Sequence, residues 1–512
     1  MTPEPPGAAE PPAPHGPPVT PEPPAPHGPP VTPEPPGALG TPLATLPGAR
    51  LWTRRLLEDL RSGRSCVCLF PQGRSSGVPT VAGALLDELL HELADFVLVP
   101  APGDGARAEV RAPAPSVRVA ATAWGDGDPV LDYDDGLSAF STARTPTAAL
   151  PAPRAPSVPA VRHEEPGYGS LADRIVKELG DPAFDRGGHT GIEGLLALLT
   201  DATERPGENR VIVVRGWLEA APVAATDLLR RLAATVKAAG MPPERRPRLL
   251  VLATATELPV ELPEEIARED VGVHWWWGAL GRLDTATVVA MSRPRPPGPA
   301  ARHQLLEAVA QATVVEVCGP FLDLAERLAV EWDGLPDGLP ERLRRLVAPA
   351  APVSGTASVP GPREAEPAAA LHPNAALRPA WNLGALDRWD GRLRRRPDAP
   401  DGHEDGADGV RTGIWLAQNH ALLPLLDTAR ERFTHVIVVR SRLRGAELVA
   451  LYGRSADMEL GAMWGAHLQG HVRLTRPEAD RLRTLWSSRN KLAHRTPLDN
   501  RALAALVDVL CS

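Results

Sequence analysis

The stretch SCVCLFPQGRSSG, from Ser65 to Gly77, decides the expected fold of the first half of the chain. Its apolar run predicts a short buried strand, and the Pro, Gly and Ser residues that follow predict a loop. Helical spacing of apolar residues comes before it in LWTRRLLEDLRSG, ending at Gly63, and after it in VPTVAGALLDELLHELA. The run FVLVP then predicts a second strand. This order is typical of a parallel α/β sheet.

The same alternation returns further along the chain, with helix GIEGLLALLTDA, strand RVIVVRGW, a helix from Val223 to Gly240, strand RLLVLAT and a strand with its loop in VGVHWWWGAL. Residues 101–165 are interrupted by Pro, Gly and Asp, so we expect loops there around a strand at Ser116–Ala121. Helical patterns run from Ala301 to Asp333. The chain is therefore expected to be multidomain, with an α/β parallel-sheet domain, a helical extension and an all-α C-terminal domain.

Composition sets the expected boundaries. The twelve residues from Pro11 to Glu22 repeat unchanged from Pro23 to Glu34, and so much Pro favours polyproline II over a packed core. This arm is either a spacer or a ligand for a Pro-binding partner. The expected units are 1–47, disordered Pro-rich repeats; 48–290, the α/β domain; 291–347, a helical extension; 348–376, a linker rich in Ala, Pro, Ser and Gly; and 377–512, a helical domain with a charged loop at Pro397–Gly413.

Charge and cysteine content exclude several classes of function. The net charge of −8 argues against nonspecific binding of polyanions by the whole chain. The four cysteines form no metal-type or redox-type pattern, and Cys66 and Cys68 are interpreted as buried strand thiols. With no signal-peptide pattern and no apolar run of about 20 residues, the expectation is a cytoplasmic protein without membrane contact.

The loop after the first strand resembles a phosphate-binding loop in which the residues that contact the nucleotide are replaced. Such a loop needs Gly at two positions, then Lys and a hydroxyl residue. The aligned residues here are Phe70, Ser75, Ser76 and Gly77. The second nucleotide feature, an acidic residue after an apolar strand, is replaced by Arg215. No nucleotide or other cofactor is therefore expected, although Thr254 ends the next strand at the position of a polar sensor.

Layout and degraded motifs over about residues 48–340 resemble the STAND and AAA-type P-loop ATPases, and more closely the inactive STAND domains of bacterial conflict systems. The resemblance implies a fold kept for scaffolding or for sensing a protein partner. A doubly wound domain of another task is the alternative. Three adjacent tryptophans follow His274, and at least one of them is expected at a surface or interface because three such side chains in a row do not all face one core.

The C-terminal region contains the sequence pattern that indicates catalytic chemistry. An Arg followed at a short distance by a His suits metal-independent RNA cleavage, because His transfers protons at the 2′-hydroxyl or leaving oxygen while Arg holds the phosphate. Four pairs have a spacing of this kind: Arg268 and His274, Arg396 and His403, Arg430 and His435, Arg489 and His494. The first falls in a strand and loop region, the second in an acidic loop, and the third just before the apolar run VIVV, in an expected core position.

The fourth pair, in RNKLAH, has the best helical context. A capping box begins at Thr475, and Leu482, Leu485, Trp486, Arg489 and Ala493 fall on one stripe at helical spacing. Two interpretations remain open. Either this stripe meets the same helix of a second subunit, so that two Arg and two His converge, or Arg489 extends to solvent at the stripe's end and His494 simply ends the helix.

RNKLAH between two helices near the chain end resembles the HEPN endoribonucleases, and the resemblance covers about residues 377–512. It implies Arg489 and His494 as catalytic residues, Asn490 as a supporting polar residue, RNA as substrate and a homodimer through this domain. A non-catalytic adaptor that binds RNA or a protein partner is the alternative, and an ATP-driven switch is disfavoured by the degraded motifs. His467 and His471 have helical metal spacing but no third ligand, so no metal site is expected.

Overall fold

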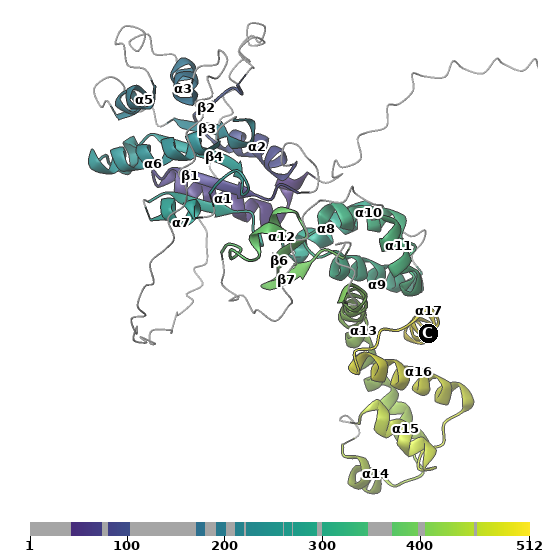
Figure 1. Cartoon of the computed structure of the whole chain (residues 1–512). Helices are drawn as coiled ribbons and strands as arrows, with labels where there is room; N and C mark the ends of the chain where they lie inside the picture. The colour runs from purple at the N-terminus through teal and green to yellow at the C-terminus, as the bar shows by residue number, and fades with distance from the viewer. Residues whose placement is uncertain are drawn as a thin grey trace, which may run out of the picture.

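The computed structural model describes residues 42–73, 80–102, 170–179, 191–200, 210–219, 222–259, 261–268, 270–293, 300–346, 371–397, 405–454 and 458–512. The expected strand at Ser116–Ala121, the Pro-rich repeats and most of the expected linker at 348–376 lie outside these ranges. Figure 1 shows the α/β part at one end of an elongated molecule and the C-terminal helices at the other, with a group of helices between them.

A five-stranded parallel sheet organises the first part, as the sequence predicted. Its order is β2-β3-β4-β1-β5, so strand β1 lies in the interior between β4 and β5. Every residue of β1 is fully buried, which explains why its sequence is an unbroken apolar run. The strands are β1 Cys66–Phe70, β2 Phe96–Leu98, β3 Val211–Arg215, β4 Arg248–Thr254 and β5 Gly272–Trp275.

Helices pack on this sheet through apolar stripes that the sequence already showed. Helix α1 (Pro47–Arg61) contacts β1 and β5, and it buries Trp52, Leu56 and Leu60. The helix ends at Arg61, and two residues later the φ of 81° at Gly63 and its closeness to Pro243 leave no room for a side chain. The other helices here are α2 Thr80–Glu92, α3 Leu171–Leu179, α5 Gly191–Thr200, α6 Pro222–Ala238 and α7 Leu262–Ala267, with short 3₁₀ turns η1 Leu43–Thr45, η4 Gly216–Leu218 and η5 Pro243–Arg245.

A second core lies between the sheet and the C-terminal helices. Its helices are α8 Arg282–Ser292, α9 Ala301–Cys318, α10 Leu322–Glu331 and α11 Leu339–Leu346, with the 3₁₀ turn η6 Pro336–Gly338. The helical pattern predicted from Ala301 to Asp333 is therefore confirmed as α9 and α10, whereas α8 was not predicted. Trp332 and Trp389 are the largest side chains of this core.

The segment after residue 370 returns to the α/β part. Helix α12 (Arg378–Asn382) is followed by a hairpin of β6 (Leu386–Trp389) and β7 (Arg392–Arg395). The expectation that residues 377–512 are all helical is wrong for this hairpin. Its two-residue turn, Asp390–Gly391, has positive φ at both positions, the pairing geometry of a tight hairpin. Trp381 and Leu386 join the core of the sheet, and Trp389 joins the second core, so the segment connects the two.

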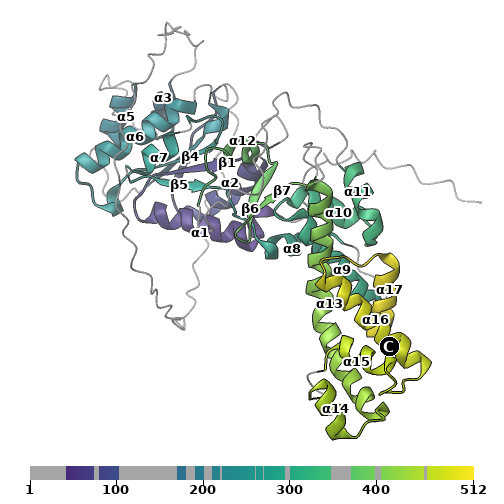
Figure 2. The same ribbon diagram turned by 60° about the horizontal axis from the view of Figure 1, so that its bottom comes forward.

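The C-terminal region is helical, as predicted. Helix α13 (Asp405–Arg440) is continuous through Pro424 and through the apolar run VIVV, and it packs lengthwise on α9 (Figure 2). The charged loop expected at Pro397–Gly413 is therefore wrong from Asp405 onward. A third core forms between α13 and the remaining helices, which are α14 Gly445–Tyr452, α15 Leu460–Leu468, α16 Arg476–Ala493 and α17 Asn500–Leu510. Among the described helices, none has both the length and the apolar content of a membrane span.

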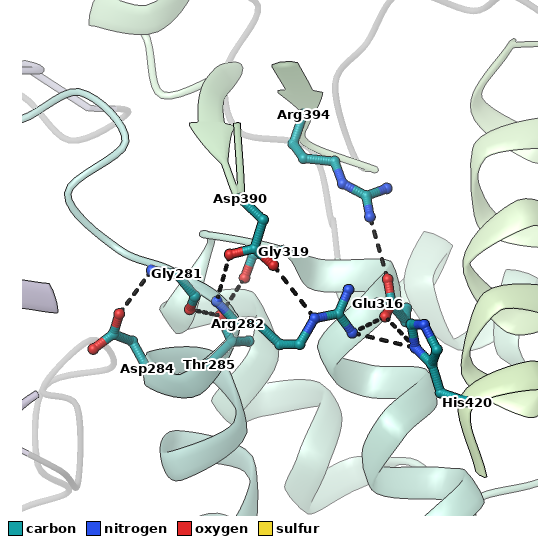
Figure 3. A network of polar contacts seen from close by, with 9 residues as sticks. All are labelled: Gly281, Arg282, Asp284, Thr285, Glu316, Gly319, Asp390, Arg394 and His420. Carbon is teal, nitrogen blue, oxygen red and sulfur yellow. Dashed lines mark hydrogen bonds and ion pairs between the residues drawn. The ribbon is translucent and has the colours of Figure 1, made fainter. Parts of the chain in front are cut away.

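A buried carboxylate marks the place where these parts meet (Figure 3). Glu316 of α9 has a fully buried side chain and forms ion pairs with Arg282 of α8, with Arg394 of β7 (3.3 Å) and with His420 of α13 (3.1 Å). The guanidinium groups of Arg282 and Arg394 each lie 5.0 Å from the ring of Trp389. The carboxylate of Glu316 thus connects α9 with α8, β7 and α13, which come from distant parts of the chain.

The N-terminal boundary of the folded part gives a first prediction. Leu43 and Leu46 are buried in the core of the sheet, so packed structure begins before the boundary expected at residue 48. Deleting residues 1–41 should leave the melting temperature nearly unchanged, because that segment is too rich in Pro to pack a core. Deleting residues 1–46 should lower it clearly, and Leu46→Ala alone should lower the free energy of unfolding by about 2–5 kcal/mol. Equal melting temperatures for the two deletions would contradict this.

A second prediction concerns Glu316. Glu316→Ala leaves Arg394 without this anion, whereas Arg282, whose side chain is 42 % exposed, keeps Asp390. The cost in stability should therefore fall below the value of about 3–5 kcal/mol that is typical of breaking a fully buried pair. Denaturant unfolding measures this difference. The matched control is Glu341→Ala on α11, whose half-exposed carboxylate pairs with Arg345 at 3.1 Å and should contribute no more than about 1 kcal/mol. A Glu316 variant as stable as the Glu341 variant would show that the junction is held by apolar packing alone.

Candidate functional site

The loop that follows β1 is bound by this chain's own α12. The backbone N–H of Gln72 donates to Asn382 Oδ1 (3.1 Å), and the N–H of Gly73 donates to the Asn382 carbonyl (2.9 Å). Asn382 is only 4 % exposed, so both bonds are shielded from water. In a phosphate-binding loop these backbone donors would face the phosphates. The degraded positions Ser75, Ser76 and Gly77 lie outside the described residues.

The remaining groups at the carboxyl edge of the sheet bind one another. Thr254 is buried at the end of β4 and its hydroxyl lies 3.1 Å from that of Thr256, while its backbone N–H donates to Glu257 (2.9 Å). Arg215 is half-buried at the end of β3, and its Nε has no hydrogen-bond partner among the described residues. A half-buried cation here disfavours a bound metal ion, so this edge lacks the arrangement that magnesium and a triphosphate require.

Three tryptophans close this edge. Trp275, Trp276 and Trp277 are all buried, so of the two places expected for at least one of them, surface or interface, the surface does not apply. Trp276 packs on Trp52 of α1 (5.3 Å between ring centroids). Trp275 and Trp277 instead lie 5.5 and 6.4 Å from Trp381, so the interface that they occupy is the one with α12.

The fourth Arg–His pair lies at the end of α16, as the capping box and Pro497 predicted. His494 is the residue that ends the helix, it is exposed, and Arg495 after it has a φ of 55°. Arg489 is 38 % exposed at its side chain and lies 3.3 Å from Glu459. Asn490, also half-buried, accepts the His494 N–H through its backbone carbonyl (3.0 Å).

The turn that carries His494 is fixed by α13. Gln418 is fully buried and makes two bonds to Leu498, accepting from its N–H (2.6 Å) and donating to its carbonyl (2.9 Å). Trp415 donates from its indole to the Leu492 carbonyl (2.6 Å), and Arg495 lies over the Trp415 ring at 5.8 Å. His494 is thus an exposed side chain on a firmly anchored backbone.

The buried face of α16 differs slightly from the predicted stripe. Leu482 and Leu485 are buried as expected, but Ser488 and Leu492 complete the buried face, while Ala493 is exposed and Arg489 lies at the edge. The leucines pack within their own chain, in the third core. Leu482 and Leu485 are therefore already covered within the chain, and Trp486, Arg489 and Ala493 are the part of the stripe that reaches the surface.

An aromatic pair lies beside this edge. Trp464 of α15 stacks on Trp486 of α16, with ring centroids 6.0 Å apart and planes at 17°, and both are half-buried. Trp486 precedes Arg489 by three residues and so shares its side of the helix. His467 lies 5.5 Å from Trp464.

The other three Arg–His pairs lie where they do not form a shared catalytic site among the described residues. Arg268 lies just after α7 while His274 lies in β5, and Arg396 forms a two-point ion pair with Asp323, with His403 outside the described residues. Arg430 and His435 both lie within α13, and His435 is exposed, so its expected core position is wrong.

The His467–His471 metal spacing fails because α15 ends at Leu468 and Gly470 turns the chain with a φ of 75°. His471 bonds instead to the Tyr452 hydroxyl, at 2.7 Å. Asn382 is the site residue that sequence reasoning missed. Its only signal in the sequence was the adjacent tryptophan and asparagine in PAWNLG, between low-complexity segments.

Comparisons of the chain with protein-family models, with curated proteins and with solved structures found no match.

The carboxyl edge of the sheet yields a third prediction. Because Asn382 binds the backbone donors of the loop and Arg215 lies where a carboxylate would hold magnesium, the purified protein should show no measurable affinity for Mg²⁺-ATP by titration calorimetry. Asn382→Ala should not create affinity, since the lysine position of the loop is still Ser76. Micromolar binding by the wild-type chain would contradict the assignment of an inactive site.

Proposed function

We propose that the C-terminal helices α13–α17 form a metal-independent endoribonuclease module of HEPN type, controlled by a nucleotide-inactive, STAND-like α/β module in a bacterial conflict or antiphage system. The observation that carries the proposal is the end of α16, where an exposed His494 on an anchored turn follows a half-exposed Arg489 by five residues. Five residues of helix rise by about 7.5 Å and turn by about 140°, so Arg489 and His494 lie on two sides of the end of α16.

The chemistry assigned to each residue follows from its side chain. His494 would exchange a proton with the ribose 2′-hydroxyl or with the leaving oxygen, and Arg489 would hold the phosphate through two donors. Asn490 would supply an amide beside them. The ion pair between Arg489 and Glu459 is largely exposed, and such pairs contribute at most about 1 kcal/mol, so a phosphate can displace Glu459 readily.

The stacked pair of Trp464 and Trp486 supports RNA as the ligand. Half-exposed aromatic rings are the platforms on which proteins stack unpaired bases, and these rings lie beside the phosphate-binding Arg489. The same pair also favours the second candidate function, a non-catalytic adaptor that binds RNA or a protein partner on this face.

Exposed apolar side chains on the C-terminal helices support a homodimer. Outside the buried cores, α13, α14 and α15 expose large apolar residues at their surface, and these are Leu425, Val438, Val439, Val449, Leu451 and Leu468. A second copy of the chain that covered them would also bring two α16 ends into one assembly.

A cleavage assay on the full-length protein tests the proposal. Cleavage of single-stranded RNA should persist in a chelator, and Arg489→Ala or His494→Ala should lower the rate by about 10²–10⁴. His494→Ala should leave the melting temperature unchanged because the imidazole is exposed. His435→Ala is the matched control, since it removes an exposed imidazole from α13 and should leave cleavage intact.

Two outcomes would overturn the assignment. Equal loss of cleavage in the His435 and His494 variants would show that the pair was chosen wrongly. RNA binding that depends on Trp486 and Arg489, with no cleavage by the wild-type protein, would establish the adaptor in place of the nuclease.

A further inference from the structure

Three side chains that can bind a metal converge at the amino edge of the sheet, far along the chain from the nuclease site. Asp59 comes from the last turn of α1, Cys66 is the first residue of β1, and His274 lies in the neighbouring strand β5. Their ligand atoms all lie within 4.8 Å of one another. Within the part of the chain that the structure describes, no other group of three His, Cys, Asp or Glu residues meets this condition.

A glycine allows these three atoms to come close together. Gly272 is the β5 residue paired with Cys66 across the sheet. A Cβ at Gly272 would lie 2.8 Å from Asp59 Oδ2, 2.9 Å from Cys66 Sγ and 3.1 Å from His274 Nε2. The three atoms therefore converge on Gly272, and a side chain at position 272 would clash with all of them.

The ligand atoms are poorly satisfied by the protein alone. His274 Nε2 is buried and makes no hydrogen bond of acceptable geometry, although Asp59 Oδ2 lies 3.0 Å away. The nearest hydrogen-bond partner of Cys66 Sγ is the Arg64 carbonyl, at 3.8 Å. Arg64 binds the other carboxylate oxygen of Asp59, Oδ1, at 2.9 Å, which leaves Oδ2 directed at the cluster.

We infer that Asp59, Cys66 and His274 bind a divalent transition-metal ion, with Zn²⁺ the best fit to one sulfur, one nitrogen and one oxygen ligand. Zn²⁺ accepts all three ligand types and prefers four-fold coordination. Asp59 and His274 retain 28 % and 12 % exposure at their side chains, so a water molecule can reach the fourth position. The carboxylate, the thiolate and a neutral imidazole together balance the two positive charges of the ion.

Protonation is consistent with this balance. Burial lowers the pKa of His274, which keeps its imidazole neutral and able to coordinate. Burial raises the pKa of the Cys66 thiol, so without metal the thiol keeps its proton. Metal binding forms the sulfur–metal bond and releases that proton to solvent, which makes the affinity rise with pH.

The site would act as a clamp on the fold. It joins α1 to β1 and to β5, and β5 ends at the first of the three tryptophans. Occupied, it would fix the amino edge of the sheet, and its loss would loosen the support of α1. Because the site shares no residue with the α16 end, its existence does not depend on the proposed nuclease activity.

Cobalt spectroscopy on the full-length protein tests the site. Reduced, chelator-treated protein carrying Cys511→Ser, which removes the exposed thiol, should bind one Co²⁺ per chain with tetrahedral visible bands and a thiolate charge-transfer band, and Zn²⁺ should displace it. Cys66→Ser should abolish the charge-transfer band, and His274→Gln should weaken binding by more than about 100-fold. Cys68→Ala, which removes the other buried thiol of β1, is the matched control and should keep both spectra.

The outcome is decisive even if a variant folds poorly. Zn²⁺ should raise the melting temperature of the wild-type chain, and this needs no substitution. Absence of Co²⁺ uptake and of a Zn²⁺-dependent shift in the wild-type protein would overturn the inference. A charge-transfer band that survives Cys66→Ser and disappears with Cys68→Ala would overturn it too, because the sulfur ligand would then be another residue.

Discussion

The arrangement of the whole molecule depends on one buried carboxylate, that of Glu316. A charge removed from water is tolerated only when oppositely charged groups surround it. Here those groups come from α8, from the β6–β7 hairpin and from α13, which are separated by up to 138 residues in the chain. The anion therefore requires these elements to meet at one place. The hairpin can satisfy Glu316 only if α12 also lies against the sheet, because the two are joined by three residues.

Helix α12 satisfies backbone groups at one edge of the sheet from within the chain. A parallel sheet exposes backbone donors and acceptors beyond the carboxyl ends of its strands, and in many folds a ligand satisfies them. In this chain Asn382 binds the loop after β1, and Trp381 covers Trp275 and Trp277. The edge that would bind a small molecule is instead a docking surface for a later part of the same chain. The sheet thereby holds the hairpin in place, which in turn holds the long helix.

The strength of local signals decided how much of this could be predicted from sequence. Strands β1, β3 and β4 were predictable because burial on both faces requires unbroken apolar runs. Helix α8 was missed because two of its buried residues, Asp284 and Thr285, are polar, and their partners at Gly48 and Gly319 are distant in sequence.

The hairpin and the site show the same limit. Asp390–Gly391 is a recognisable turn signal, but charged strands on either side concealed it. For α16, the capping box indicated where the helix starts and Pro497 where it ends. The pattern of apolar residues fits two neighbouring faces of the helix, because both faces include the same leucines. The sequence therefore could not decide whether Arg489 or Ser488 faces the core. The metal cluster joins residues more than 200 positions apart, and no local pattern contains it.

Pro424 lies within α13, close to the point where the helix contacts Glu316, and this position affects how the helix can bend. Proline has no backbone N–H, so the carbonyl of the residue four positions earlier lacks its helical hydrogen bond, and that residue is His420, the one that contacts Glu316. The helix is thus weakest next to the point where it is anchored. The 20 residues beyond His420 extend about 30 Å, so a rotation of about 10° at this joint would carry the far end by about 5 Å. A small rotation at Pro424 would therefore move the far end of α13 relative to the contact between His420 and Glu316.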